Sequence, residues 1–150
     1  MNLDYAALTE EIEKILENTQ TITLATCSDY KVTARSMAII NDGVNILFQT
    51  SGLSEKIKQL TENHNVAFSV GNIQIEAVAH ITKNPKEIRS FIEKYKVKYP
   101  QYFSTYSGMP DEVTVVCEPV KFALYKFIDG KPCTDILDVS KTLAYREVLD

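Results

Sequence analysis

Arg35 is the residue of this sequence whose type and position most clearly point to chemistry. It lies in the middle of a segment, residues 32–40, that is typical of a β-strand with apolar residues on both faces. A guanidinium group keeps its proton at physiological pH, so a largely buried one needs an anion close by. No carboxylate lies next to Arg35 in the sequence. We therefore expect Arg35 either to pair with a carboxylate from elsewhere in the fold or to bind an anionic ligand.

A second group suited to anions follows one predicted hairpin later. An Asn-Asp-Gly turn at 41–43 and a second strand at 44–49 lead into a polar loop and a helix. Ser54 is the candidate N-cap of this helix, and Lys56 lies in its first turn. Free backbone N–H groups at a helix start, together with a lysine, form a site suited to phosphate. Arg35 is thus one hairpin away from a helix end that is suited to bind anions.

The composition is that of an ordinary globular domain. The 150 residues are 45% hydrophobic and 24% charged, without a repeat or linker, so we expect one domain over residues 1–150. No stretch approaches the roughly 20 apolar residues of a membrane helix, and the acidic N-terminus does not resemble a signal peptide. A cytoplasmic protein without a membrane partner is expected. The net charge of −4 argues against nucleic acid as a partner, and the spacing of Cys and His predicts no metal site.

The periodicity of apolar residues predicts a mainly β chain with flanking helices. Helices are expected at 3–18, 54–63 and 84–99, and another from Ser140, with a loop at 100–111. Further strands are expected at 21–27, 66–70, 73–81, 113–117 and 120–128, the last two separated by a break at Glu118-Pro119. Six or so strands with short turns and packed helices favour an α+β fold built on an antiparallel barrel.

Several of these features recur together in a known family. They are the Arg35-Ser36-Met37 strand, the Asp-Gly turn, a strand ending in Thr50, and Ser54-x-Lys56 at a helix start, continued by IKQLTENHNVAFSV. The set resembles the FMN-binding split-barrel family, which includes pyridoxamine 5′-phosphate oxidase. The resemblance covers residues 21–81 well and the remainder loosely. It implies a split β-barrel, FMN as cofactor, and a flavin-dependent oxidoreductase that acts on a small molecule.

The resemblance also implies where FMN binds. In the family, the Arg and Lys hold the FMN phosphate, and backbone groups of the Arg strand face the isoalloxazine ring. The flavin lies at the interface of a homodimer, so the partner subunit also contacts it. Carried over to this sequence, the cofactor-binding residues are Arg35, Ser36, Met37, Gln49, Thr50, Ser54 and Lys56, with Asn72 and Gln74 reaching the flavin of the partner subunit.

The sequence departs from the oxidase branch of the family at two places. The residue before the Lys is commonly basic there and is Glu55 here, where a carboxylate would repel a phosphate. The residues that hold pyridoxal phosphate in the oxidase have no match in segment 133–150, so oxidation of vitamin B6 is not expected. Two alternatives stay open: a flavin-binding or sensing protein without turnover, and a haem-handling relative on the same fold, which would need His64 or His80 as a ligand.

Overall fold

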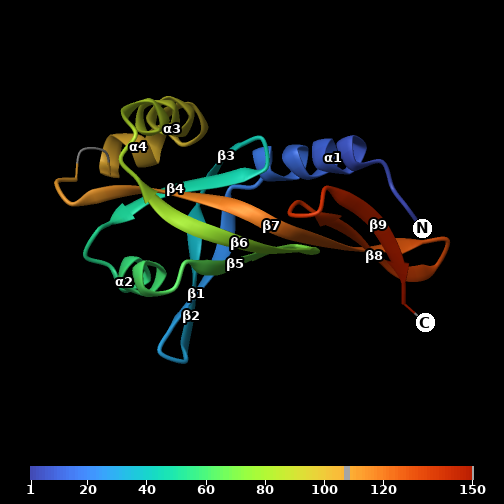
Figure 1. Cartoon of the computed structure of the whole chain (residues 1–150). Coiled ribbons are helices and arrows are strands. Elements are labelled where there is room, and N and C mark those ends of the chain that lie inside the picture. Colours follow the sequence, from blue (N-terminus) through green and yellow to red (C-terminus); the bar gives the residue numbers. More distant parts are fainter. Residues whose placement is uncertain (107–108, 150) are drawn as a thin grey trace.

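The chain folds into one antiparallel β-sheet with helices around it, as the sequence predicts (Figure 1). The computed structural model describes residues 1–106 and 109–149. Their helices are α1 (Tyr5–Glu17), α2 (Glu55–Glu62), α3 (Pro85–Lys98) and α4 (Pro100–Tyr106). Their strands are β1 (Thr21–Ser28), β2 (Lys31–Ala38), β3 (Ile40–Asp42), β4 (Asn45–Ser51), β5 (Asn65–Val70), β6 (Ile73–Thr82), β7 (Glu112–Ile128), β8 (Lys131–Asp138) and β9 (Leu143–Val148). The strand order is β2-β1-β5-β6-β7-β4-β3, with β8 paired to β7 and β9 to β8.

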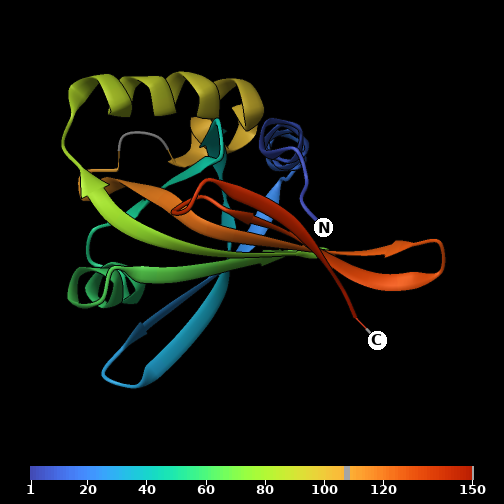
Figure 2. The same cartoon turned by 45° about the vertical axis from the view of Figure 1, so that its right-hand side comes forward.

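The main hydrophobic core lies between the sheet, α1 and α2. The N-cap residue of α1 is Asp4, whose carboxylate accepts a hydrogen bond from Ala7 N at 3.0 Å, and the helix buries Leu8, Ile12 and Leu16. A second cluster lies on the opposite face of β3, β4 and β7, beneath α3, and consists of Ile40, Leu47, Phe91, Tyr99 and Val116. Figure 2 shows α3 and α4 stacked on that side, away from α2. No helix in the described part of the chain is long and apolar enough to cross a membrane.

Strand β7 is continuous across the position where we expected a break. Its pairing with β6 shifts between Glu76 and Ala77, which lie opposite Lys121 and Pro119, so that Val120 forms a bulge. A proline has no N–H to donate to a ladder, and a bulge is one of the few places where a sheet accepts it. The predicted break was therefore wrong: β7 passes through it and pairs with β4, β6 and β8.

Two predictions for the C-terminal half were also wrong. The helix expected from Ser140 is the strand β9, which pairs with β8 along its length and brings the described strands to nine rather than six or so. The expected loop at 100–111 begins with the helix α4, because Pro100 suits a first helical position. Residues 107 and 108 of that expected loop lie outside the described part of the chain.

Strand β2 is an edge strand in this structure, although the sequence gives it apolar residues on both faces. It pairs only with β1, and the side chain of Val32 is 68% exposed. It also ends at Ala38, before the predicted Ile40, because the chain bends there and Ile40 begins β3, which pairs with β4. Apolar residues on a free edge strand are a surface that a second protein can cover.

Candidate functional site

Arg35 lies on the inner face of β2, opposite the buried Leu24 of β1, and is held there by neutral groups. Its Nη1 donates to Thr26 Oγ1 at 2.8 Å and to the Leu24 carbonyl at 3.3 Å, and its Nη2 donates to Thr33 Oγ1. No salt bridge within the described residues includes Arg35. The first of the two expectations from the sequence, an ion pair with a carboxylate, is therefore not met here, and the guanidinium charge remains available to a ligand.

Lys56 lies beside Arg35 in the first turn of α2. Its Nζ donates to Thr50 Oγ1 at 2.8 Å, again a neutral partner. Burial lowers the pKa of the Lys56 ammonium, and the neighbouring charge of Arg35 lowers it further. Two neighbouring, partly buried cations repel each other, and an anion bound between them would offset that repulsion. The pair is therefore a candidate anion site by its electrostatics as well as by its residue types.

Glu55 lies near the two cations but pairs with a different residue. Burial lowers the pKa of Arg35, and the negative charge of Glu55 partly offsets this effect. The carboxylate of Glu55 lies 3.6 Å from Lys31 Nζ, and its side chain is 53% exposed. Glu55 thus acts on the anion site from its rim, through solvent.

The loop between β4 and α2 is fixed in place by Asp111. Gly52 N donates to the Asp111 carbonyl at 2.7 Å, and a Cβ at residue 52 would lie 3.0 Å from the same oxygen, so only glycine fits without a shift. Ser51 Oγ donates to the Asp111 carboxylate. Ser54 occupies the N-cap position as predicted, yet its hydroxyl donates to the Ser51 carbonyl at 2.8 Å and does not cap the helix. The first N–H groups of α2 are consequently left without a side-chain cap.

Gln59 and two threonines belong to the site and were not predicted. Gln59 projects from α2, is only 2% exposed, and its Oε1 accepts from the hydroxyls of Thr26 and Thr33, the same hydroxyls that hold Arg35. The available signal was spacing: Gln59 lies three residues after Lys56 on one helix face, and Thr33 lies two residues before Arg35 on one strand face. Nothing in the sequence indicates that these two faces meet.

The other predicted residues of the Arg35 strand and of β4 divide between two faces. Met37 points inward with Arg35 and packs against the core, whereas Ser36 is exposed on the outer face. Thr50 faces Lys56, but Gln49 is on the opposite face of β4, where its Nε2 donates to Thr114 Oγ1 at 2.9 Å. The structure therefore brings Arg35, Thr50, Ser54 and Lys56 together and leaves Ser36 and Gln49 on other surfaces.

Gln74 and Asn72 lie far from the anion site of their own chain. Through the register of the sheet, Gln74 is in one row with Ser69, Thr23 and Ser36 on the outer face. This face carries a groove of about 460 Å³ that Gln74 lines together with small side chains such as Ala25 and Ala67. Asn72, at the turn before β6, exchanges hydrogen bonds with the backbone of Tyr125.

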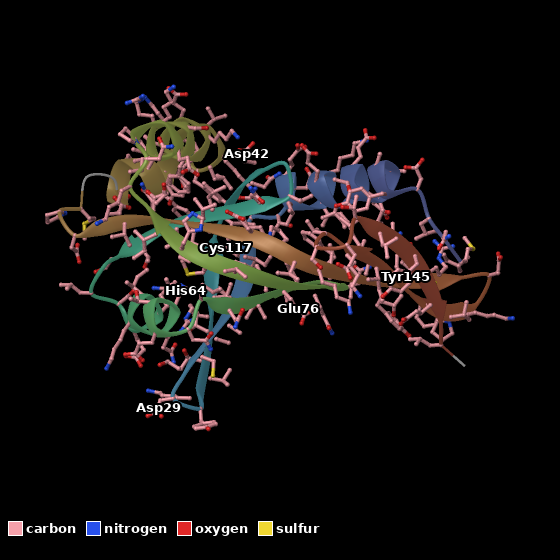
Figure 3. All side chains as sticks on the ribbon, viewed as in Figure 1. Asp29, Asp42, His64, Glu76, Cys117 and Tyr145 are labelled. Carbon is pink, nitrogen blue, oxygen red and sulfur yellow. The ribbon has the colours of Figure 1, made fainter. Side chains whose placement is uncertain are left out.

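Both histidines lie at the surface of the molecule. His64 is exposed where α2 leads into β5 (Figure 3). His80 is exposed on β6. Within the described residues, no three His, Cys, Asp or Glu side chains are grouped as a metal site would require. Cys117 and Cys133 are buried, and burial raises the pKa of the Cys117 thiol, so this residue is an inert part of the core.

Comparison with known proteins identifies relatives of this arrangement. A family model described as Pyridoxamine 5′-phosphate oxidase matches residues 8–126, which include all the site residues discussed above. A search of curated protein sequences found no significant match.

Solved structures share the fold at low sequence identity. General Stress Protein 26 from Bacillus anthracis is 20% identical, with a TM-score of 0.64 and coverage of 77% of this chain and 91% of that chain. HutZ, the heme storage protein from Vibrio cholerae, is 13% identical, with a TM-score of 0.61 and coverage of 78% and 91%. A protein named F420 Reductase is 22% identical, with a TM-score of 0.62 and coverage of 73% and 94%. At these identities the likeness establishes the fold alone.

Proposed function

The chain belongs to the pyridoxamine 5′-phosphate oxidase family, and from this premise we propose that it binds FMN, with the cofactor phosphate held between Arg35 and Lys56. The observation that carries the proposal is this pair of neighbouring cations, whose hydrogen-bond partners in the described residues are all neutral. A phosphate monoester carries between one and two negative charges at neutral pH, so one phosphate can satisfy both cations.

Two further groups can donate hydrogen bonds to the same phosphate. Thr50 Oγ1 accepts from Lys56, so its own proton is free to be donated to a phosphate oxygen. The uncapped first turn of α2, after Ser54, offers backbone N–H groups and the positive end of the helix dipole. Arg35, Lys56, Thr50 and the backbone after Ser54 thus form the proposed phosphate site.

The isoalloxazine ring is proposed to lie along β2. Among the described residues this strand is paired on one side only, so every second residue of β2 has a backbone N–H and C=O without a strand partner. One of the adjacent residues Ser36 and Met37 can therefore turn both backbone groups toward the ring. FMN supplies the redox chemistry, and the protein orients the ring and controls access to it. We propose an oxidoreductase rather than a pyridoxamine phosphate oxidase, and the fold shared with a protein named F420 Reductase supports a redox role.

A homodimer is proposed to complete the flavin site. Ser36 and Gln74 belong to one chain's outer face, where small side chains and a groove leave room for a second copy. Gln74 and Asn72 of one protomer would then contact the flavin that is bound by its partner, and Gln49 would lie at the rim. Pairing of the two outer faces would also cover the exposed Val32 of β2.

A haem-binding protein is the second candidate, and the fold shared with a heme storage protein is the observation that favours it. Haem binding requires an iron ligand, and the two histidines of the chain, His64 and His80, are the candidates. A flavin-binding protein without turnover is the remaining alternative.

Ligand titration of the purified chain tests these assignments. FMN is expected to raise the melting temperature and to lose fluorescence on binding. Riboflavin, which lacks the phosphate, and FAD, whose added nucleotide has no second phosphate site here, are expected to bind more weakly. If no flavin raises the melting temperature at high concentration and haem produces a Soret band, the haem-binding function replaces the one proposed.

Turnover and assembly require separate measurements. Oxidation of a reduced nicotinamide with an acceptor, in the presence of FMN, distinguishes an enzyme from a flavin-binding protein. Light scattering at micromolar concentration is expected to give the mass of a dimer. A monomer that binds FMN tightly would rule out the shared site.

A further inference from the structure

We propose that Gln59 is a positioning residue for the anion site, acting on Arg35 through the hydroxyls of Thr26 and Thr33, and that its lack of charge keeps the guanidinium available to the ligand. This inference rests on the proposed function, because it concerns the same phosphate site. It assigns a role to a buried polar side chain that contacts neither the proposed ligand nor Arg35 directly.

The orientation of the Gln59 amide is fixed by its three hydrogen bonds. Its Oε1 lies 2.5 Å from both Thr26 Oγ1 and Thr33 Oγ1, and its Nε2 donates to the Lys31 carbonyl at 3.1 Å. Rotating the amide by half a turn would bring Oε1 against the Lys31 carbonyl oxygen, and two acceptors cannot share a hydrogen bond. The amide therefore presents an acceptor, and only an acceptor, to both hydroxyls.

This arrangement fixes where the two hydroxyl protons point and leaves both hydroxyl oxygens to accept from Arg35, which can only donate. A hydroxyl group has a single proton. Because Thr26 and Thr33 both donate that proton to Gln59, their oxygens are left as acceptors, and each accepts one N–H of the Arg35 guanidinium. The planar guanidinium is thereby held in one orientation, and its N–H groups that have no acceptor among the described residues can donate to a ligand.

The neutrality of Gln59 matters as much as its geometry. A glutamate at residue 59 could accept from the same two hydroxyls, but its charge would lie one hydroxyl away from Arg35 and would compete with the ligand for the guanidinium. Proteins commonly hold a half-buried arginine with a carboxylate. Here an amide and two hydroxyls hold it without reducing its charge.

The test compares two ligands that differ only in the phosphate. Dissociation constants for FMN and riboflavin are measured by fluorescence quenching for the full chain and for Gln59→Met, Gln59→Glu and Thr33→Val. Thr61→Val is the matched control: it removes a hydroxyl from the same helix, where Thr61 Oγ1 bonds only the Ile57 carbonyl.

Gln59→Met is expected to weaken FMN by about tenfold, the effect of one weakened charge-assisted hydrogen bond, and riboflavin by less than about twofold. Gln59→Glu is expected to weaken FMN further at pH 8. Its deficit relative to the unmodified chain should shrink as the pH is lowered toward about 4, near the ordinary pKa of a glutamate carboxyl, because the introduced group is then protonated. Thr33→Val, which keeps the side-chain shape, should reproduce the selective loss if Gln59→Met does not fold.

Three outcomes would overturn the inference. If FMN and riboflavin weaken together in Gln59→Met and in Thr33→Val, then Gln59 supports the fold and not the phosphate site. If Gln59→Met binds FMN with the same affinity as the control Thr61→Val, Gln59 has no role in binding. If the unmodified chain binds FMN no more tightly than riboflavin, the phosphate site itself is absent. This last result refutes the proposed function, whereas the first two leave it intact.

Discussion

Replacing Glu55 by Gln should strengthen FMN binding, and Coulomb's law gives the order of magnitude of the gain. The carboxylate lies near enough to Arg35 to affect its pKa, and its exposed position places water between it and the site. For a separation of about 7 Å and an effective dielectric constant of about 60, each unit-charge pair repels by about 0.8 kcal/mol. A bound phosphate with nearly two charges would thus be repelled by about 1.5 kcal/mol before screening by salt.

Salt reduces this repulsion strongly. With a Debye length of about 30 Å at 0.01 M and about 8 Å at 0.15 M ionic strength, about 1.2 and 0.6 kcal/mol remain. Glu55→Gln is therefore expected to tighten FMN by nearly tenfold at low salt and by about threefold at physiological salt. Glu55→Arg should go further in the same direction. Either substitution also removes the ion-pair partner of Lys31, whose Nζ lies 3.6 Å from the Glu55 carboxylate, and an unpaired Lys31 would add to the gain in FMN affinity.

The assay is the FMN dissociation constant at several salt concentrations, with riboflavin as the ligand without phosphate. Glu62→Gln is the control, because it removes the same charge from the far end of α2, about 10 Å further along the helix axis. Equal effects of the two substitutions, or a gain for riboflavin as large as for FMN, would mean that the phosphate lies elsewhere and that the reasoning is wrong.

Three further outcomes are expected. Arg35→Ala should weaken FMN by about 1.5–3 kcal/mol with little change in riboflavin affinity, and equal loss for both ligands would indicate a structural role. Because the pKa of Lys56 is lowered, it loses its proton at a lower pH than an ordinary lysine, and FMN affinity should fall as pH rises through that lowered value. Lys56→Arg should move this fall to higher pH. A pH profile of FMN affinity that is the same in both proteins would contradict the assignment. Asp135 is buried and bonded to Arg146 and Lys126, and its pKa is lowered. Its stabilising contribution is therefore present above its ordinary pKa and is lost as pH falls through the folded one. Asp135→Asn should destabilise the chain by about 2–3 kcal/mol in urea unfolding at pH 7, and this difference should shrink as the pH is lowered below the ordinary pKa of an aspartate; a difference that does not change with pH would contradict this.

The neighbourhood of Arg35 and Lys56 was predictable because each of its parts leaves a local signal. A charged residue in an apolar strand lacks a partner, and a serine and a lysine at a helix start mark an anion site. The contribution of Gln59 was not predictable, because its partners are on a hairpin that the sequence does not connect with α2. The position of Gln74 was not predictable for the same reason, because only the sheet register shows that Gln74 shares a row with Ser36.

The errors in the fold arise from long-range pairing. Segment 143–148 has no strong preference of its own for helix or strand. It becomes a strand because β8 offers a free edge for pairing and because Arg146 forms an ion pair with Asp135 of that strand. Pro119 suggested a break because the sequence does not reveal the bulge at Val120. An edge strand with two apolar faces, such as β2, cannot be distinguished from a central strand by periodicity alone.

The central position of β7 has a consequence for how the chain acquires its structure. Ile46 in β4 pairs with Cys117, and Ile73 in β6 pairs with Leu124, so both earlier strands keep one edge open until β7 has been synthesised. Contacts this distant in sequence form slowly, because a long loop must close before any pairing is gained. While the chain emerges from the ribosome, two apolar edges are therefore exposed to other nascent chains. A fragment that ends before Glu112 would keep both edges open permanently and would be expected to aggregate rather than fold.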